Sequence, residues 1–210
     1  MKLDLEGAGT QRKKTFALLR EICAEGDRKC LFSAFIWGVG CFYYRQWIKG
    51  AVYLLLEAAF ILFFVFFGGD ALVGFFTLGT KEANPWFGIE GDNSITMLIW
   101  GILAIIMLIL AGITAWSSVK STYYTQCRVQ KGEKPETFRQ TLAGLLDKNF
   151  YKTALFLPII SVCVFSVLPI VFMILIAFTN YGGDIVPPKL VDWVGLANFV
   201  KLFNLSEFSS

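Results

Sequence analysis

The sequence predicts an all-α, polytopic membrane protein with three transmembrane helices, a cytoplasmic N-terminus and an extracellular C-terminal segment. Of its 210 residues, 56% are hydrophobic and only 17% are charged, which is more apolar than an ordinary soluble domain. The apolar residues form three runs that are long enough to cross a membrane as helices. The basic residues fall on alternating sides of these runs, as in a multi-pass membrane protein.

The N-terminal segment, 1–50, is expected to lie in the cytoplasm. Residues 1–29 mix acidic and basic side chains without an apolar core, so they are not a cleavable signal peptide, and we expect the native start to be retained. The stretch 30–47 is rich in aromatic residues and contains two glycines. We favour a short re-entrant or interfacial helix there, because aromatic side chains suit the headgroup level. The alternative is a fourth span. It would place the basic residues that precede residue 30 on the opposite side of the membrane from Arg45 and Lys49.

Three apolar segments are predicted to be transmembrane helices, namely 51–67, 95–116 and 154–178. A helix rises about 1.5 Å per residue, and the hydrocarbon core of a bilayer is about 30 Å thick. In lipid every backbone N–H and C=O group needs a partner within the segment. These runs must therefore be helical despite their many β-branched residues.

The basic residues predict the orientation of the spans. Nine Lys and Arg residues precede residue 51 and seven lie in 117–153, whereas one lies in 68–94 and two lie in 179–210. By the positive-inside rule, 117–153 is a cytoplasmic loop, whereas 68–94 and 179–210 are extracellular. In 136–150, apolar residues repeat at helical spacing, which predicts an amphipathic helix on the cytoplasmic surface.

The residue types exclude several functions. The chain has no histidine, which removes His-based acid–base catalysis, Ser/His or Cys/His nucleophilic pairs and His-ligated metals. Its five cysteines lack both CxxC spacing and a regular disulfide pattern, so we expect free thiols rather than metal ligands. A net charge of +3 gives no reason to expect nucleic acid as a partner. No catalytic residue and no metal site are therefore predicted.

Glu57 is the one ionisable residue inside a predicted span. A charge within a membrane is costly, so Glu57 is a candidate functional residue by default. A structural role is the alternative, because a Glu near a helix end can be protonated or hydrogen-bond to a neighbouring helix. Pro158 and Pro169 each remove one backbone hydrogen bond from the third span and should kink it.

Neither of two nucleotide-binding patterns is complete. Gly38-x-Gly40 lacks the third glycine and the preceding strand of a dinucleotide site, and close helix packing or a turn explains it better. The P-loop pattern GxxxxGK[ST] does not occur, so this chain is not expected to bind ATP itself.

The outer end of the third span carries a specific pair of motifs. Phe178-Thr179-Asn180-Tyr181 closes the span, and Gly195-Leu196-Ala197-Asn198-Phe199 follows after a short gap. With Leu157-Pro158 and Leu168-Pro169 upstream, this pair resembles the permease subunits of carbohydrate ABC importers. The likeness is to the larger, MalF-like subunit of maltose and maltodextrin systems.

A second resemblance covers 36–57, which is similar to the N-terminal extension of such permeases in Gram-positive bacteria. The matching residues are Gly38, Gly40, Tyr43, Gln46, Lys49 and Gly50. Cys41 departs from the pattern, because Gln is more usual at that place.

The resemblance implies that this chain is the N-terminal part of a longer permease in a bacterial cell membrane. Further spans would hold the sugar site and the cytoplasmic loop that docks on the ATPase. The implied partners are a second permease subunit, ATPase subunits that bind the ATP and an extracellular sugar-binding protein. The implied substrate is maltose, maltodextrin or a related oligosaccharide, bound at residues outside this chain.

A small three-span scaffold or assembly protein that is complete at Ser210 is the alternative function. It would account for spans without a coupling loop. A membrane enzyme is disfavoured, because the acidic residues Glu133, Glu136 and Asp147 are spaced like a solvated loop rather than a catalytic cluster.

Overall fold

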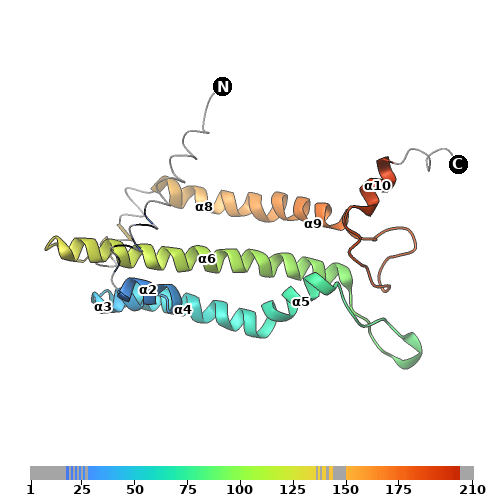
Figure 1. Cartoon of the computed structure of the whole chain (residues 1–210), viewed down its shortest axis with the longest axis horizontal. Coiled ribbons are helices and arrows are strands. Elements are labelled where there is room, and N and C mark those ends of the chain that lie inside the picture. The colour runs from blue at the N-terminus through green and yellow to red at the C-terminus, as the bar shows by residue number, and fades with distance from the viewer. Residues whose placement is uncertain are drawn as a thin grey trace, which may run out of the picture. The chain divides into compact units, whose positions relative to one another are not determined.

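The part of the chain that the structure describes is helical, with isolated β-bridges but no strand. This computed structural model describes residues 28–135 and 150–203, together with residues 18, 20, 22, 24, 26, 137, 139, 140, 142 and 143. Figure 1 shows the helices in chain order. Three of them are long and apolar enough to cross a membrane, which confirms the predicted fold class. The N-in, C-out orientation stays a prediction.

The first membrane-spanning helix runs from Trp47 to Thr77. It consists of α4 (Trp47–Phe63), a π-helical turn η1 (Phe64–Gly68) and α5 (Gly69–Thr77). The apolar run suggests an end at residue 67, but the helix continues for ten residues through Gly68 and Gly69. It stops where Leu78 takes a left-handed φ of 53° and donates its N–H to the Gly74 carbonyl at 2.8 Å.

The second membrane-spanning helix, α6 (Ser94–Gln130), has 37 residues. Asn93 caps its start, since the Oδ1 atom of Asn93 accepts hydrogen bonds from the N–H groups of Ile95 and Thr96, both at 3.1 Å. Gly132, with a φ of 78°, follows its end. Because a span needs only about 20 residues, the polar turns after Trp116 extend α6 beyond the apolar part.

The third membrane-spanning helix combines α8 (Phe150–Val162), the π-helical turn η3 (Cys163–Val167) and α9 (Leu168–Ile176). Pro158 lies inside α8, and Pro169 is the second residue of α9, directly after η3. Each proline therefore lacks an N–H group within a continuous helical run. Both prolines therefore fall within the helical run, as expected, and the predicted kinks stay a prediction.

The stretch 30–47 includes most of α2 (Arg28–Phe35) and all of α3 (Val39–Tyr43), two short helices of eight and five residues. The helices are separated by the helix break, 36–38, in which Gly38 has a φ of 85°. Each is far shorter than the about 20 residues that a span requires. The choice between a re-entrant and an interfacial placement stays a prediction.

The contacts divide the chain into two compact units, Met1–Ala59 with Leu110–Gly144 and Phe60–Ile109 with Leu145–Ser210. The first has a small core of Ile22, Cys30, Val119 and Tyr123. The second has a core of Leu78, Leu98, Ile102 and Val191, against which side chains of α9 such as Phe172 pack. A final short helix, α10 (Ala197–Phe203), belongs to the second unit.

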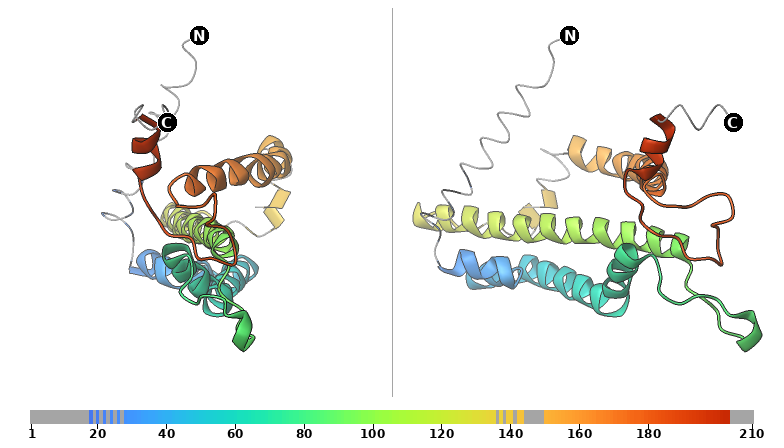
Figure 2. Two further views of the ribbon diagram at one scale, coloured as in Figure 1. Left: turned by 90° about the vertical axis from the view of Figure 1, so that its right-hand side faces the viewer. Right: turned by 45° about the vertical axis from the view of Figure 1, so that its right-hand side comes forward.

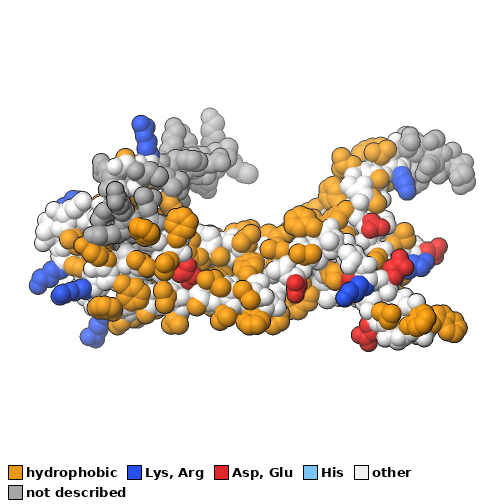
Figure 3. Space-filling model, turned by 60° about the horizontal axis from the view of Figure 1, so that its bottom comes forward, with side chains coloured by type: hydrophobic (Ala, Val, Ile, Leu, Met, Phe, Trp, Pro, Cys, Tyr) orange, Lys and Arg blue, Asp and Glu red, His pale blue; other side chains and the backbone are white. Residues whose placement is uncertain are grey.

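Most apolar side chains of the helices face outward. In Figure 3, hydrophobic side chains cover much of the visible helical surface. None of the apolar window in Pro158–Ile176 is buried within the chain. Such a surface is expected for helices that are solvated by lipid or covered by other membrane segments. The predicted amphipathic helix over 136–150 lies largely outside the described residues.

Candidate functional site

The two motifs at the end of the third span contact each other directly. We call residues 177–203 the return segment, because the chain leaves α9 and turns back toward it. The carbonyl oxygen of Phe178 accepts hydrogen bonds from the N–H groups of Val194 and Gly195, at 2.9 and 3.0 Å. Thr179 and Trp193 also form an antiparallel β-bridge. The backbone therefore brings the first motif beside the second.

Asn198 fixes the end of α9 with its side chain. Its Nδ2 atom donates to the carbonyl oxygens of Ala177 and Thr179, at 2.9 and 2.7 Å. The rings of Phe178 and Phe199 lie 5.3 Å apart, a separation typical of stabilising aromatic pairs. The last carbonyl groups of a helix have no partner within it, so this side chain satisfies groups that would otherwise need water.

Asn180 and Thr179 complete the turn. Asn180 donates its N–H to the Asp192 carbonyl at 3.0 Å, and its Oδ1 atom accepts from the Asp192 N–H at 2.8 Å. The fully buried Thr179 donates its hydroxyl to the Ile176 carbonyl at 2.8 Å. Two further side chains of the motifs, those of Tyr181 and Leu196, are exposed, in contrast to Thr179.

The return segment is anchored on the ends of two other helices. The Val191 N–H donates to the Ser94 hydroxyl at 2.9 Å, and the Trp193 indole N–H donates to the Phe75 carbonyl at 3.2 Å. Figure 2 shows this segment beside the junction between α5 and α6. No sequence motif indicates Phe75 or Ser94 as partners, because contacts between residues about 100 apart leave no local pattern.

Glu57, the candidate residue within the first span, contacts the helix break. Its Oε2 atom accepts a 2.9 Å hydrogen bond from the backbone N–H of Trp37. The next N–H, of Gly38, donates to the Ser118 hydroxyl at 2.9 Å. Side chains from α4 and α6 thus satisfy backbone groups that the interrupted helix exposes. This contact is structural, and whether Glu57 has a functional role stays untested.

Three hydroxyl groups form a buried network beside the helix break. The Ser33 hydroxyl lies 3.0 Å from that of Ser118 and 3.1 Å from that of Thr122. Gly40 lies so close to Thr122 that a β-carbon at this position would overlap it. Small and hydroxyl-bearing residues allow helices to approach closely in membranes. Ser118 and Thr122 are spaced four apart, a signal that the sequence interpretation overlooked.

Neither cluster has the composition of a catalytic or metal centre. Among the described residues, no group of three or more His, Cys, Asp or Glu side chains could hold a metal ion. Both clusters instead consist of hydroxyl, amide and carboxylate groups that bond to backbone atoms. Their chemistry is that of structural caps and helix contacts.

Comparison with known proteins finds relatives among transport permeases. The chain is 30% identical over 184 residues to the maltodextrin transport system permease protein MalC of Streptococcus pneumoniae, covering 87% of this chain and 41% of MalC. It is 31% identical over 185 residues to the galactooligosaccharides transport system permease protein GanP of Bacillus subtilis, covering 86% of this chain and 42% of GanP. Over most of its length, this chain is similar to permease proteins of sugar transport systems.

The similarity to permeases bears out several of the predictions made from the sequence. A third relative, the maltodextrin transport system permease protein MdxF of Bacillus subtilis, is 30% identical over 186 residues, covering 86% of this chain and 40% of MdxF. The resemblance drawn from the motifs is confirmed, as is the expectation of a multi-pass membrane protein that is not an enzyme. No family model and no solved structure matches. The chain spans about two fifths of the length of these permeases.

Proposed function

We propose that this chain is part of the transmembrane subunit of an ATP-driven oligosaccharide importer. The similarity to three transport permeases over at least 86% of the chain carries the proposal. The three apolar helices support it, because a permease subunit must hold several helices in lipid. The same similarity also favours a transporter over the small membrane scaffold that three spans alone would allow.

The proposed substrate class is maltodextrin or a related oligosaccharide. Two of the relatives are named for maltodextrin transport and one for galactooligosaccharide transport. The proposed partners are a second permease subunit, ATPase subunits that bind and hydrolyse ATP, and an extracellular sugar-binding protein. The absence of a P-loop pattern from this chain supports the assignment of ATP to a separate subunit.

We assign the return segment and the hydroxyl network a supporting role at the periphery of the translocation pathway. The return segment ties the end of α9 to the start of α6 through Val191 and Ser94, which orients the third span for the chain that follows the motifs. The hydroxyl network beside the helix break holds α2 against α6 in the same way. Both contacts would aid insertion and assembly rather than bind sugar.

Uptake measurements test the proposal. The gene is deleted from its source cells, and uptake of radiolabelled maltotriose and of a labelled galactooligosaccharide is compared with that of the parent strain. Loss of uptake of one sugar, restored by the intact gene, is the expected result and identifies the substrate. Unchanged uptake of both sugars would contradict the oligosaccharide assignment.

A further inference from the structure

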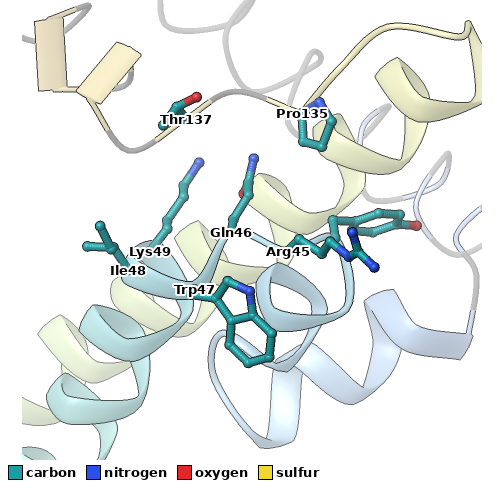
Figure 4. Close-up of a pocket in the computed structure, with 8 residues that line it drawn as sticks. Arg45, Gln46, Trp47, Ile48, Lys49, Pro135 and Thr137 are labelled. Carbon is teal, nitrogen blue, oxygen red and sulfur yellow. The ribbon is translucent and has the colours of Figure 1, made fainter.

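A cavity of about 250 Å³ lies where α4 begins, and we call it the basic cavity. It is lined by Tyr44, Arg45, Gln46, Trp47, Ile48, Lys49, Pro135 and Thr137. Figure 4 shows Gln46 and Lys49 pointing from the start of α4 toward the side that carries Pro135 and Thr137. Among the lining side chains that the structure describes, two are cationic and none is acidic. This charge favours an anion as the occupant.

The basic cavity lies at the boundary between the apolar span and the polar residues that precede it. Trp47 is the first residue of the span and its side chain is 65% exposed, while Tyr43 is 58% exposed. Trp and Tyr are enriched at the membrane–water interface, because their rings are apolar and their edges polar. In Figure 4 the Trp47 ring points away from Thr137. An anion in the cavity would therefore lie at the depth of the lipid headgroups.

An unusual turn places Arg45 at this cavity. Arg45 has a φ of 58°, which non-glycine residues rarely adopt. The turn is held by the N–H of Gln46, which donates to the Cys41 carbonyl at 2.9 Å, and by the N–H of Arg45, which donates to the Phe42 carbonyl at 3.0 Å. It also directs the chain into α4, whose first turn adds a partial positive charge. In Figure 4 the Lys49 amine points toward Thr137, whereas the Arg45 guanidinium points away from it on the far side of Gln46. Lys49 and the start of the helix therefore supply the positive potential inside the cavity, and Arg45 adds positive charge at its rim.

We propose that the basic cavity binds the phosphate-bearing headgroup of an anionic phospholipid such as phosphatidylglycerol. Basic pockets beside transmembrane helices recognise acidic headgroups by this chemistry. The cavity is smaller than the about 300 Å³ at which ordinary small-molecule sites begin, so it fits a headgroup better than an oligosaccharide. Lys49 would pair with the phosphate as a compact charge, and Arg45 would add positive charge at the rim of the cavity.

The surface beside the cavity suits the rest of the lipid. Ile48, Val52 and Leu55 lie along the first turns of α4 and are 59%, 43% and 69% exposed. Acyl chains that extend from a bound headgroup would cover these apolar side chains and shield them from water. The proposal goes beyond the transport function and does not depend on it, because lipid binding is measurable without sugar or ATP.

Native mass spectrometry of the purified full chain in detergent tests the proposal. The protein is titrated with phosphatidylglycerol or with phosphatidylcholine of the same acyl chains, and glycerol 3-phosphate is added as a soluble competitor. Phosphatidylglycerol should bind more tightly than phosphatidylcholine. Lys49→Gln and Arg45→Asn should each weaken its binding about fivefold, as expected for one basic residue. Asn is chosen at residue 45 because it tolerates a positive φ.

Lys189→Gln is the matched control, because it removes the same charge from a residue that does not line the basic cavity. It should leave the binding of phosphatidylglycerol unchanged, and circular dichroism should show equal helicity in all variants. Lys49 is only half-buried, so Lys49→Gln is expected to fold even if Arg45→Asn does not. Unchanged binding in Lys49→Gln, or equal binding of the two lipids, would overturn the proposal. Competition by glycerol 3-phosphate is expected of a headgroup site, whereas binding of glycerol 3-phosphate without binding of phosphatidylglycerol would assign the cavity to a soluble phosphate instead.

Discussion

The side-chain amide of Asn198 donates a 2.7 Å hydrogen bond to the backbone carbonyl of Thr179. These residues belong to the two separate motifs that resemble the permease family, and the contact gives the motifs a structural reason to occur together. α9 ends at Ile176, so the carbonyls that Asn198 reaches lie directly beyond the helix. A residue from the second motif thus supplies donors that the helix end lacks.

Replacing Asn198 should loosen the return segment. Asn198→Ala removes donors to two carbonyl groups, which should cost about 1–2 kcal/mol because the site is partly exposed. The loosening can be measured by hydrogen exchange at the amides of Val194 and Gly195, which donate to the Phe178 carbonyl. Their exchange should accelerate about tenfold for each 1.4 kcal/mol that is lost. Lys201→Ala, an exposed change on α10, is the control and should leave exchange unchanged.

Substitutions at Glu57 should separate its structural role from a role of its charge. Glu57→Gln keeps an acceptor for the Trp37 N–H, so the unfolding temperature of the detergent-solubilised protein should stay close to that of the wild type. Glu57→Leu removes the acceptor and should destabilise the fold by about 1–3 kcal/mol. If Glu57→Gln instead abolished sugar uptake while the protein remained folded, the ionised carboxylate would be functional.

The extent of the helices was harder to predict than their existence. Hydrocarbon requires a continuous apolar run, so all three spans were visible in the sequence. Gly68, Gly69 and Asp70 suggest a loop, yet the structure is helical there, since tertiary context overrides weak local propensity. The polar end of α6 was missed because its turns pack on α2 through Ser118 and Ser33, a contact that hydropathy does not report.

The candidate site was predicted only in part. The motif residues came from family resemblance, and the structure adds the contacts that join them. Phe75 and Ser94 could not be found in this way. Each lies more than 90 residues away from its partner in the return segment, which is Trp193 for Phe75 and Val191 for Ser94. Long-range pairs of this kind depend on how the helices pack rather than on any local pattern.

Gly40 should tolerate no larger side chain. A β-carbon at Gly40 would overlap the Thr122 side chain, so Gly40→Ala should destabilise the protein by about 1–3 kcal/mol. The additional change Thr122→Ala should recover part of this loss, and a double-mutant cycle of thermal unfolding measures the coupling. Gly112→Ala is the matched control, because no neighbouring atom lies within 4 Å of the place that a β-carbon would take there. Equal effects of Gly40→Ala and Gly112→Ala would contradict the close packing.

The loop before α6 should depend on pH through Asp92. Hydrogen bonds from the N–H groups of Thr80 and Lys81, at 2.8 and 3.0 Å, hold the pKa of the Asp92 carboxyl below its usual value. A lowered pKa means that the ionised form stabilises the loop at neutral pH and that this contribution is lost as the pH falls below about 4. The carboxyl ¹³C shift of Asp92 should titrate with a midpoint below the ordinary Asp value. In Asp92→Asn, the exchange of the Thr80 amide should lose this pH dependence, and a midpoint above about 4 in the wild type would contradict the assignment.

Labelling with a membrane-impermeant maleimide should reveal the orientation. The positive-inside rule places the seven basic residues of 117–153 in the cytoplasm, because translocating a charged loop is unfavourable. Cysteines at the exposed positions Lys131 and Asp184 report on the loops at the two ends of the spans. Asp184 is preferable to Gly183, whose φ of 57° disfavours a side chain. Asp184→Cys should react in intact cells, above the background of the native cysteines, and Lys131→Cys only after permeabilisation. The reverse pattern would mean that the chain is inserted with its N-terminus outside, and it would move the basic cavity to the outer leaflet without removing its charge.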